Sequence, residues 1–246
     1  MKLLVCISRT PETTAKITFT SDGQSFDSAG VSYIMNPYDE WYALVRAIEL
    51  KEADAGTVTA FHVGTAESDT VIRKALAIGA DDAVRVDAEA KDARYVAEQI
   101  AAYAKDKGFD GIFMGKETID YNGNEVAGMV AELLDLPYVS YANHLEMDGS
   151  TARIKRDIEG GVEVVEVSGP FVLSASKGLA EQRIPNMRGI MMAKRKPLEV
   201  IAASESSTKV EVVGYQLPEE KSAVKMIDPE NMDELVRLLH EEAKVI

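Results

Sequence analysis

The stretch FMGKETIDYNGNEVAGMVAELLDL, residues 113–136, is the clearest junction between a strand and a helix in this chain. An apolar run ends at Gly115, and about ten polar and small residues follow it. Apolar side chains then recur at helical spacing, at Val126, Met129, Val130 and Leu133. The first turn of the predicted helix therefore lies near residues 123–126. A buried strand that leads through a loop into a helix is the repeating unit of a parallel α/β sheet.

The same alternation of strand and helix runs through the sequence before this junction. Apolar runs predict strands, and amphipathic segments predict the helices between them. The predicted strands are at 2–8, 56–64, 82–87 and 110–115, and the predicted helices are at 37–53, 67–80 and 92–109. Gly108 marks the end of the last helix. Near-continuous apolar strands are typical of a sheet that is covered on both faces. The pattern predicts an α/β fold with a doubly wound, mostly parallel sheet, of the adenine-nucleotide-hydrolase-like or Rossmann-like kind.

The first of these helices has local start signals. Asn36 is a favourable N-cap residue, and Pro37 suits the first helical position. Asp39 and Glu40 then fall in the first turn, where the helix dipole favours negative charge. We therefore expect the helix to begin at Pro37.

After Leu136 the pattern changes to antiparallel hairpins. Two glycine-centred turns, at 147–151 and 158–163, separate alternating segments, and 198–203 resembles a further strand. Asp228 and Pro229 introduce a short C-terminal helix. We expect three parts: a nucleotide-binding α/β core with its hairpin extension at 1–182, a loop and the strand after it at 183–200, and a C-terminal arm at 201–246 that packs on a partner subunit.

The composition excludes several functional classes. The 246 residues carry a formal net charge of −14, which argues against a nucleic-acid binder. No apolar run reaches the roughly 18 residues of a membrane span, so we expect no membrane insertion. The only cysteine, Cys6, lies in the first strand, which indicates a reducing compartment. Residues 1–12 lack the features of a signal peptide, and we expect a bacterial cytoplasm, or a mitochondrial matrix in a eukaryote.

The junction at 115–126 has the chemistry of an anion cradle. Gly123 permits a backbone conformation with positive φ, and the helix that follows offers free N–H groups at its positive dipole end. Lys116, Asn122 and Asn124 add side-chain donors. Alternatively, residues 122–124 only turn the chain and cap the helix. The loop has neither the Walker pattern nor the glycine fingerprint of dinucleotide-binding sites.

Ligands of open α/β sheets bind at the carboxyl ends of the strands. Four junctions are therefore candidates, and they are residues 7–9, 36–39, 63–65 and 115–126.

Signals for catalysis are weak in this sequence. His62, His144 and His240 have no metal-ligand spacing, and Cys6 has no evident base beside it. Glu117 and Asp120 could form an acid–base pair, but solvated loop carboxylates are far commoner. We expect no catalytic residue and no metal site. A segment at 187–197 is unusual in another way, because it is basic and rich in methionine within an acidic chain, which is typical of a partner-binding surface.

Five blocks in order resemble one known family. They are MNPYDEWYALVRAIELKE, IRKALAIGADDAVRV, GKETIDYNGNEVAGMVAELLDLP, IEGGVEVVEV and IMMAKRKPLEV, and together they resemble the β-subunit of electron-transfer flavoproteins from residue 2 to about 200. The resemblance implies an electron carrier rather than a stand-alone catalyst. It also implies a heterodimer with an α-subunit that holds most of the FAD, electrons received from acyl-CoA and other flavoprotein dehydrogenases, and delivery to a quinone oxidoreductase.

The resemblance further implies one AMP bound by this chain, or a second FAD in electron-bifurcating, NADH-oxidising relatives. The family's nucleotide site falls here on Cys6, Asn36, Pro37, Tyr38, Asp39, Val63, Gly115, Lys116, Glu117, Thr118, Ile119, Asp120, Tyr121, Asn122, Gly123, Asn124, Glu125 and Val126. These are the junctions that the sheet argument selects independently. Tyr121 and Asn122 replace the small or acidic pair of many relatives, which leaves AMP and a second FAD both open.

The basic segment resembles the family's recognition loop, which docks dehydrogenases. The implied partner-binding residues are Met187, Arg188, Ile190, Met191, Lys194, Arg195 and Lys196. Met187 stands where the family usually has its leucine anchor. Two other classes compete with this interpretation. A universal-stress-type ATP-binding regulator would have neither the basic segment nor the long arm, and a nucleotide-alpha-hydrolase-like ligase would need an S-G-G-x-D-S loop after the first strand.

Overall fold

The computed structural model describes residues 1–221 and 223–246. The chain divides into two compact units. The larger one comprises Met1–Ile17 with Ser28–Val212, and the smaller one comprises Thr18–Asp27 with Val213–Ile246. The sheet, the helices that cover it and all four candidate junctions belong to the larger unit.

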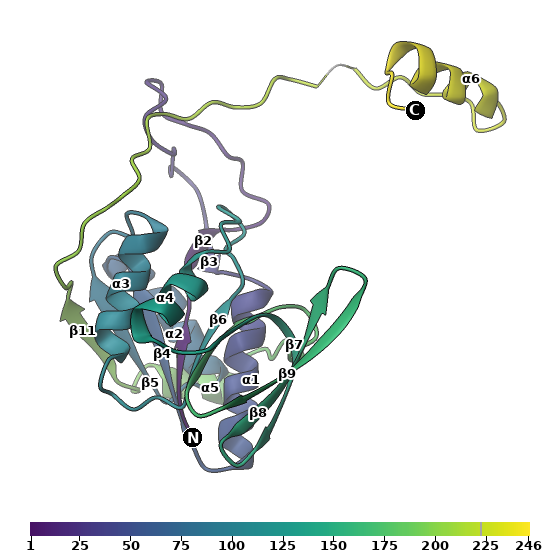
Figure 1. Ribbon diagram of the computed structural model, residues 1–246. Helices are drawn as coiled ribbons and strands as arrows, with labels where there is room; N and C mark the ends of the chain where they lie inside the picture. The colour runs from purple at the N-terminus through teal and green to yellow at the C-terminus, as the bar shows by residue number, and fades with distance from the viewer. Residues whose placement is uncertain (222) are drawn as a thin grey trace. The chain divides into compact units, whose positions relative to one another are not determined.

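A mixed sheet organises the larger unit (Figure 1). Within the described residues it has nine strands in the order β11-β5-β4-β1-β6-β10-β7-β8-β9. Strands from β11 to β7 run parallel, and β7, β8 and β9 are antiparallel. The bounds are β1 Lys2–Cys6, β4 Thr57–Val63, β5 Asp82–Asp87, β6 Gly111–Gly115, β7 Tyr138–Asp148, β8 Thr151–Ile158, β9 Gly161–Ser168, β10 Phe171–Ala175 and β11 Leu198–Ala202. The predicted mostly parallel sheet with a hairpin extension is confirmed.

Helices cover the parallel part on both faces, as the doubly wound prediction requires. Alternate residues of β1 show this, because Leu3 and Val5 pack in one buried cluster while Leu4 and Cys6 pack in another. The first cluster contains α1 (Asp39–Ala53) and α2 (Asp69–Ile78), and the second contains α3 (Ala93–Ala104) and α4 (Val126–Leu134). A helix α5 (Met187–Ala193) lies against α2, and its Ala193 joins the first cluster.

The remaining elements of this unit are short. The two-stranded antiparallel sheet of β2 (Arg9–Pro11) and β3 (Tyr33–Met35) follows β1, and the 3-10 turn η1 (Ala66–Ser68) precedes α2. Both predicted hairpin turns are present: Gly149, with φ 58°, lies between β7 and β8, and Gly160, with φ 82°, lies between β8 and β9. Glycine adopts this left-handed conformation without steric cost.

The predicted start of α1 is wrong. The helix begins at Asp39 rather than at Pro37, and its N-cap is Tyr38, which has φ 64°. The side chain of Asn36 reaches across to another loop: its amide donates to Glu117 O (3.0 Å), and its carbonyl accepts from Ile119 N (3.0 Å). Two bonds to a distant backbone replace the single local cap bond that the sequence pattern indicates.

Three other boundaries differ from the sequence predictions. Helix α3 ends at Ala104 rather than at Gly108, and the segment predicted as a loop from residue 187 forms α5, because Asn186 caps it by accepting from Gly189 N (2.8 Å). The C-terminal helix α6 (Met232–Arg237) begins after Asn231 rather than at Pro229. The Asn231 side chain accepts from Glu234 N and so places the helix start later.

The smaller unit joins an N-terminal hairpin to the C-terminal arm. Phe19 and Phe26 form an isolated antiparallel bridge, and Phe19 stacks on Tyr215 with ring centroids 4.8 Å apart. In the arm, α6 continues into a short π-helical turn, η2 (Leu238–Glu242). None of the helices in the described residues has the length and apolar character of a membrane span.

A buried carboxyl group joins β1 to α1. Glu40 is only 5% exposed, and its Oε2 accepts a hydrogen bond from Ser8 N at 2.6 Å. Burial raises the pKa of Glu40 from 4.5 to about 8, the bond from Ser8 opposes this increase, and Asp120 and Asp39 add to it. The group is therefore mostly protonated at neutral pH.

We expect Glu40→Gln to remove a pH dependence of stability. A carboxyl group with a folded pKa above its unfolded pKa stabilises the fold fully below pH 4.5 and loses that contribution as pH rises through about 8. The wild type should therefore lose stability relative to the variant between pH 5 and pH 9, measured by urea unfolding. The exposed Glu132→Gln is the control and should follow the wild type. Parallel pH profiles for Glu40→Gln and the wild type would contradict the burial argument.

Candidate functional site

The carboxyl ends of β1, β4 and β6 lie side by side because these strands are parallel neighbours. This edge brings the predicted segments 36–39 and 115–126 together. The two bonds of Asn36 to Glu117 O and Ile119 N connect them directly. The loop after β6 is also tied to β10, since Lys116 N donates to Ala175 O (3.2 Å).

Close packing at Gly115 allows the two segments to meet. A Cβ added to Gly115 would lie 2.7 Å from Cγ of Glu40 and 2.9 Å from the Glu40 backbone nitrogen. Any side chain at this position would push β6 away from the first turn of α1. The glycine that ends the strand is therefore required by backbone approach, which is one of the standard reasons for glycine in a binding loop.

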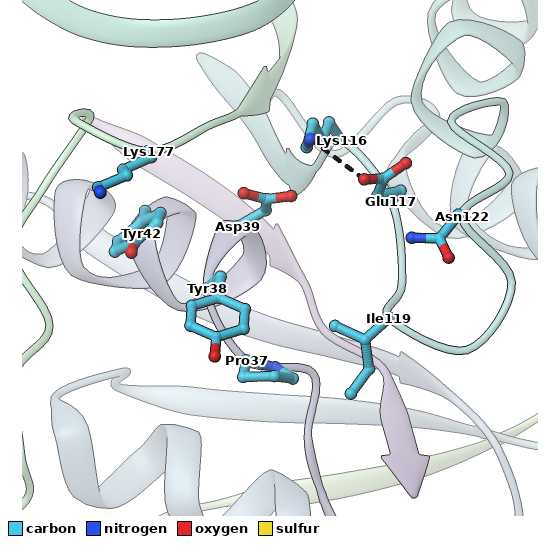
Figure 2. Close-up of a pocket in the computed structure, with 9 residues that line it drawn as sticks. All are labelled: Pro37, Tyr38, Asp39, Tyr42, Lys116, Glu117, Ile119, Asn122 and Lys177. Carbon is cyan, nitrogen blue, oxygen red and sulfur yellow. Dashed lines mark ion pairs between the residues drawn. The ribbon is translucent and has the colours of Figure 1, made fainter. Parts of the chain in front are cut away.

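A cavity of about 310 Å³ lies between the two segments (Figure 2). Its described lining is Pro37, Tyr38, Asp39, Tyr42, Lys116, Glu117, Ile119, Asn122 and Lys177. The sequence prediction named all of these except Tyr42 and Lys177. Tyr42 lies one helical turn after Tyr38, so the helical period could have revealed it. Lys177 follows β10, and only the strand order places it beside the loop after β6.

The cavity carries charges of both signs. Lys116 Nζ pairs with Glu117 Oε1 at 3.1 Å, shown as the dashed line in Figure 2. This bond raises the pKa of Lys116, so the ammonium stays charged. Burial raises the pKa of Asp39 to about 6, while Lys116 lowers it and Glu117 raises it. The cavity thus presents a fixed cation together with carboxylates that accept hydrogen bonds.

The conformation of the loop differs from the prediction at Gly123. Positive φ occurs at Asn122 and Asn124, at 50° each, and not at Gly123, so the prediction for Gly123 is wrong. Asparagine tolerates this region because its short polar side chain bonds locally. The Asn124 amide also makes a tertiary bond, because it donates to Tyr141 Oη at 2.8 Å, 17 residues along the chain. The two asparagines therefore provide the turn.

The predicted helix after the loop is present, but its first turn starts later than the predicted 123–126. It begins at Val126, and its N-cap, Glu125, makes no side-chain cap bond within the described residues. The N–H groups of the first turn of α4 thus have no side-chain acceptor from the cap position. These uncapped amides follow the asparagine turn in sequence, outside the cavity lining, and are donors of the kind found in anion sites.

Other predicted site residues do not line this cavity. Cys6 and Val63 are each 6% exposed and lie in the cluster with α3 and α4. Burial, and secondarily Glu40, raise the pKa of the Cys6 thiol, which makes it unreactive. Asn36 and Gly115 build the junction without lining the cavity. The remaining positions also lie outside the lining. Val126 begins α4, and the others belong to the loop: Thr118, Asp120, Tyr121, Gly123, Asn124 and Glu125.

The histidines have structural surroundings. His62 Nδ1 is 2.8 Å from Ile7 O, and burial lowers the pKa of this histidine. His144 lies 3.0 Å from Glu146 Oε1 on the hairpin, and His240 belongs to η2. Among the described residues, no three side chains of His, Cys, Asp or Glu gather to hold a metal ion. The cavity between segments 36–39 and 115–126 is the candidate binding site because predicted site residues from both segments line it.

Helix α5 contains most of the residues predicted to bind a partner. Met187 and Met191 are 74% and 67% exposed, and Ile190, Arg188, Lys194 and Arg195 are exposed as well. Lys196 differs, because it is partly buried and its Nζ donates to Leu76 O (2.9 Å) and to Ala80 O. The exposed surface therefore consists of Ile190, methionines and basic residues, and it does not include Lys196.

Comparison with known proteins agrees with this architecture. The family model "Electron transfer flavoprotein domain" matches residues 25–206. The chain is 39% identical to the electron transfer flavoprotein subunit beta of Bacillus subtilis, with all of both chains covered. It is 38% identical to that of Syntrophomonas wolfei, over 94% of this chain and 91% of the other, and 31% identical to that of Mus musculus, over 100% and 99%. The chain therefore belongs to the electron transfer flavoprotein β-subunit family.

Proposed function

We propose that this chain is the β-subunit of a heterodimeric electron carrier. The carrier accepts electrons from acyl-CoA and other flavoprotein dehydrogenases and passes them to a quinone oxidoreductase. The observation that supports this most directly is the similarity along the whole chain to proteins named as beta subunits of electron transfer flavoproteins, since that name implies an alpha subunit. Reversible electron transfer is the chemistry that a bound flavin supplies.

The proposed role of the cavity is to hold a nucleotide that does not react. The residues fit a phosphate group, because Lys116 and Lys177 line the cavity as cations and the lining loop leads into the first turn of α4, which has no side-chain cap. The volume of about 310 Å³ is within the range of small-ligand sites. Asp39 and Glu117 line the same cavity and could accept hydrogen bonds from ribose hydroxyl groups. We assign AMP to this site.

The chain itself contributes enclosure rather than redox chemistry. FAD held by the α-subunit would be covered in part by this subunit, and exclusion of water is the usual contribution of such a surface. Cys6, the only thiol, is buried and unreactive. The exposed methionines of α5 would then dock the dehydrogenase, since flexible thioethers adapt to several partner surfaces.

The first test is the nucleotide content of the purified heterodimer. We expect one FAD and one AMP per pair of subunits after denaturation, extraction and chromatography. Two FAD would instead identify an electron-bifurcating carrier that oxidises NADH. The absence of any adenine nucleotide from this chain's site would contradict the assignment of the cavity.

A matched pair of substitutions at Asn122 tests the loop. Asn122 has φ 50°, which glycine adopts freely and β-branched residues resist. We expect Asn122→Gly to retain AMP and Asn122→Val to lose most of it, because the strained valine moves the loop. Both variants remove the amide side chain, so equal losses would show that the amide, and not the backbone conformation, holds the nucleotide.

Substitution of Met187 tests the docking surface. We expect Met187→Ala to raise the KM of a flavoprotein acyl-CoA dehydrogenase for the carrier about tenfold, as truncation of an interface anchor does. Its flavin and AMP contents should stay at wild-type values, because α5 lies away from the cavity lining. Met187→Leu is the control and should keep the wild-type KM. Equal KM values for all three proteins would exclude Met187 as an anchor.

A further inference from the structure

Two cations connect α2 and α5. Arg73, on α2, donates from Nη1 to the carbonyls of Ala193 (2.8 Å) and Lys196 (2.7 Å), where α5 ends. Lys196, after α5, donates from Nζ to the carbonyls of Leu76 (2.9 Å) and Ala80, where α2 ends. The last carbonyls of a helix lack partners within the helix and carry partial negative charge, so each cation caps the other segment's helix.

A glycine allows the two helices to approach this closely. A Cβ added to Gly189 would lie 2.4 Å from the carbonyl oxygen of Ala77, a distance that no side chain can accept. Helix α5 therefore packs directly on the backbone of the last turn of α2. The contact is specific in position, since a shift of either helix would separate the cations from their carbonyls.

The chain leading into α5 is fixed at a third place. The indole N–H of Trp41 donates to Arg183 O (3.2 Å), and the Arg183 guanidinium makes a two-pronged ion pair with Glu52 (2.7 and 3.0 Å). This exposed pair adds little energy by itself. Together with the bonds of Arg73 and Lys196, this pair and the Trp41 bond restrict the backbone of residues 183–196 at both ends.

The basic segment is thus divided into two kinds of residue. Lys194 and Arg195 are exposed, and their side chains make no hydrogen bond or ion pair within the described residues. Lys196 is partly buried, and burial lowers its pKa. The charges of Lys194 and Arg195 can therefore contact a partner, whereas the charge of Lys196 is bonded to backbone carbonyls within this chain.

We propose that Arg73 and Lys196 are positioning residues, which clamp α5 so that its exposed methionines have a fixed geometry before a dehydrogenase docks. A seven-residue helix is not stable alone, so the order of α5 must come from its contacts with α2. An ordered docking surface binds more tightly because it loses less conformational entropy on association. The docking half of this inference rests on the proposed function, whereas the clamp itself does not.

The test uses the complete heterodimer and two readouts. Hydrogen exchange of the peptide that contains residues 187–196 reports the order of α5, and the KM and kcat of a purified flavoprotein acyl-CoA dehydrogenase for the carrier report docking. In Arg73→Ala, we expect exchange of this peptide about tenfold faster, since a charged hydrogen-bond donor is lost. KM should rise by about the same factor. The kcat value and the salt dependence of KM should stay unchanged.

Three further variants serve as controls and as a second test of the clamp. Lys194→Ala should leave hydrogen exchange at the wild-type rate. Its KM should depend less on salt concentration than the wild-type KM, because an exposed charge at the rim of an interface acts on the association rate. Arg73→Lys should give exchange and KM values between those of the wild type and Arg73→Ala, because lysine keeps the charge but has a shorter side chain than the one that places Nη1 between the two carbonyls. If Arg73→Ala does not assemble, Lys196→Gln provides the same comparison from the other side of the clamp.

Each outcome decides one half of the inference. Wild-type exchange of residues 187–196 in both Arg73→Ala and Lys196→Gln would overturn the clamp. Faster exchange with an unchanged KM, while Met187→Ala still raises KM, would overturn the positioning role. If Met187→Ala also leaves KM unchanged, α5 is not the docking surface; the proposed function then fails at that point, and faster exchange would still support the clamp.

Discussion

The close contact between the end of β6 and the first turn of α1 organises this molecule. Gly115 lies against Glu40, and Glu40 in turn accepts the backbone N–H of Ser8 after β1. Three segments that are far apart in the sequence are thus held at one edge of the sheet. The buried carboxyl group stays neutral there because its pKa is raised to about 8. An ionised group in the same place would carry a large desolvation cost.

The candidate site is a consequence of this contact. With the first turn of α1 fixed against Gly115, Asn36 can bond the backbone at Glu117 and Ile119. The cavity then lies between the loop after β6, which contributes Lys116 and Glu117, and a helix start that carries Asp39. No group in it resembles a nucleophile with its base, which agrees with holding a ligand rather than transforming it. Helix α5, with its exposed methionines, is also held by side chains that bond the backbone carbonyls of a distant segment.

Some features were predictable because they depend on local pattern. The period of apolar residues placed most strands and helices, and Gly-centred turns placed the hairpins. The predictions failed where distant contacts compete with local ones. Asn36 has the sequence signature of a helix cap, yet two bonds to the loop at 117–119 use its side chain. Gly123 is the residue that best tolerates positive φ, yet the flanking asparagines adopt it.

The fold class, the family resemblance and the four junctions can be read from the amino-acid sequence, because side-chain periodicity and turn chemistry are local properties of the chain. Which residues at those junctions line one cavity depends on how distant segments pack together. This packing added Lys177, since the order of strands is not local, and left Cys6 and Val63 in the core. It also decided that Lys196 holds α2 while Lys194 faces solvent. These two lysines are alike in sequence, and their roles differ because only one lies where helix carbonyls lack partners.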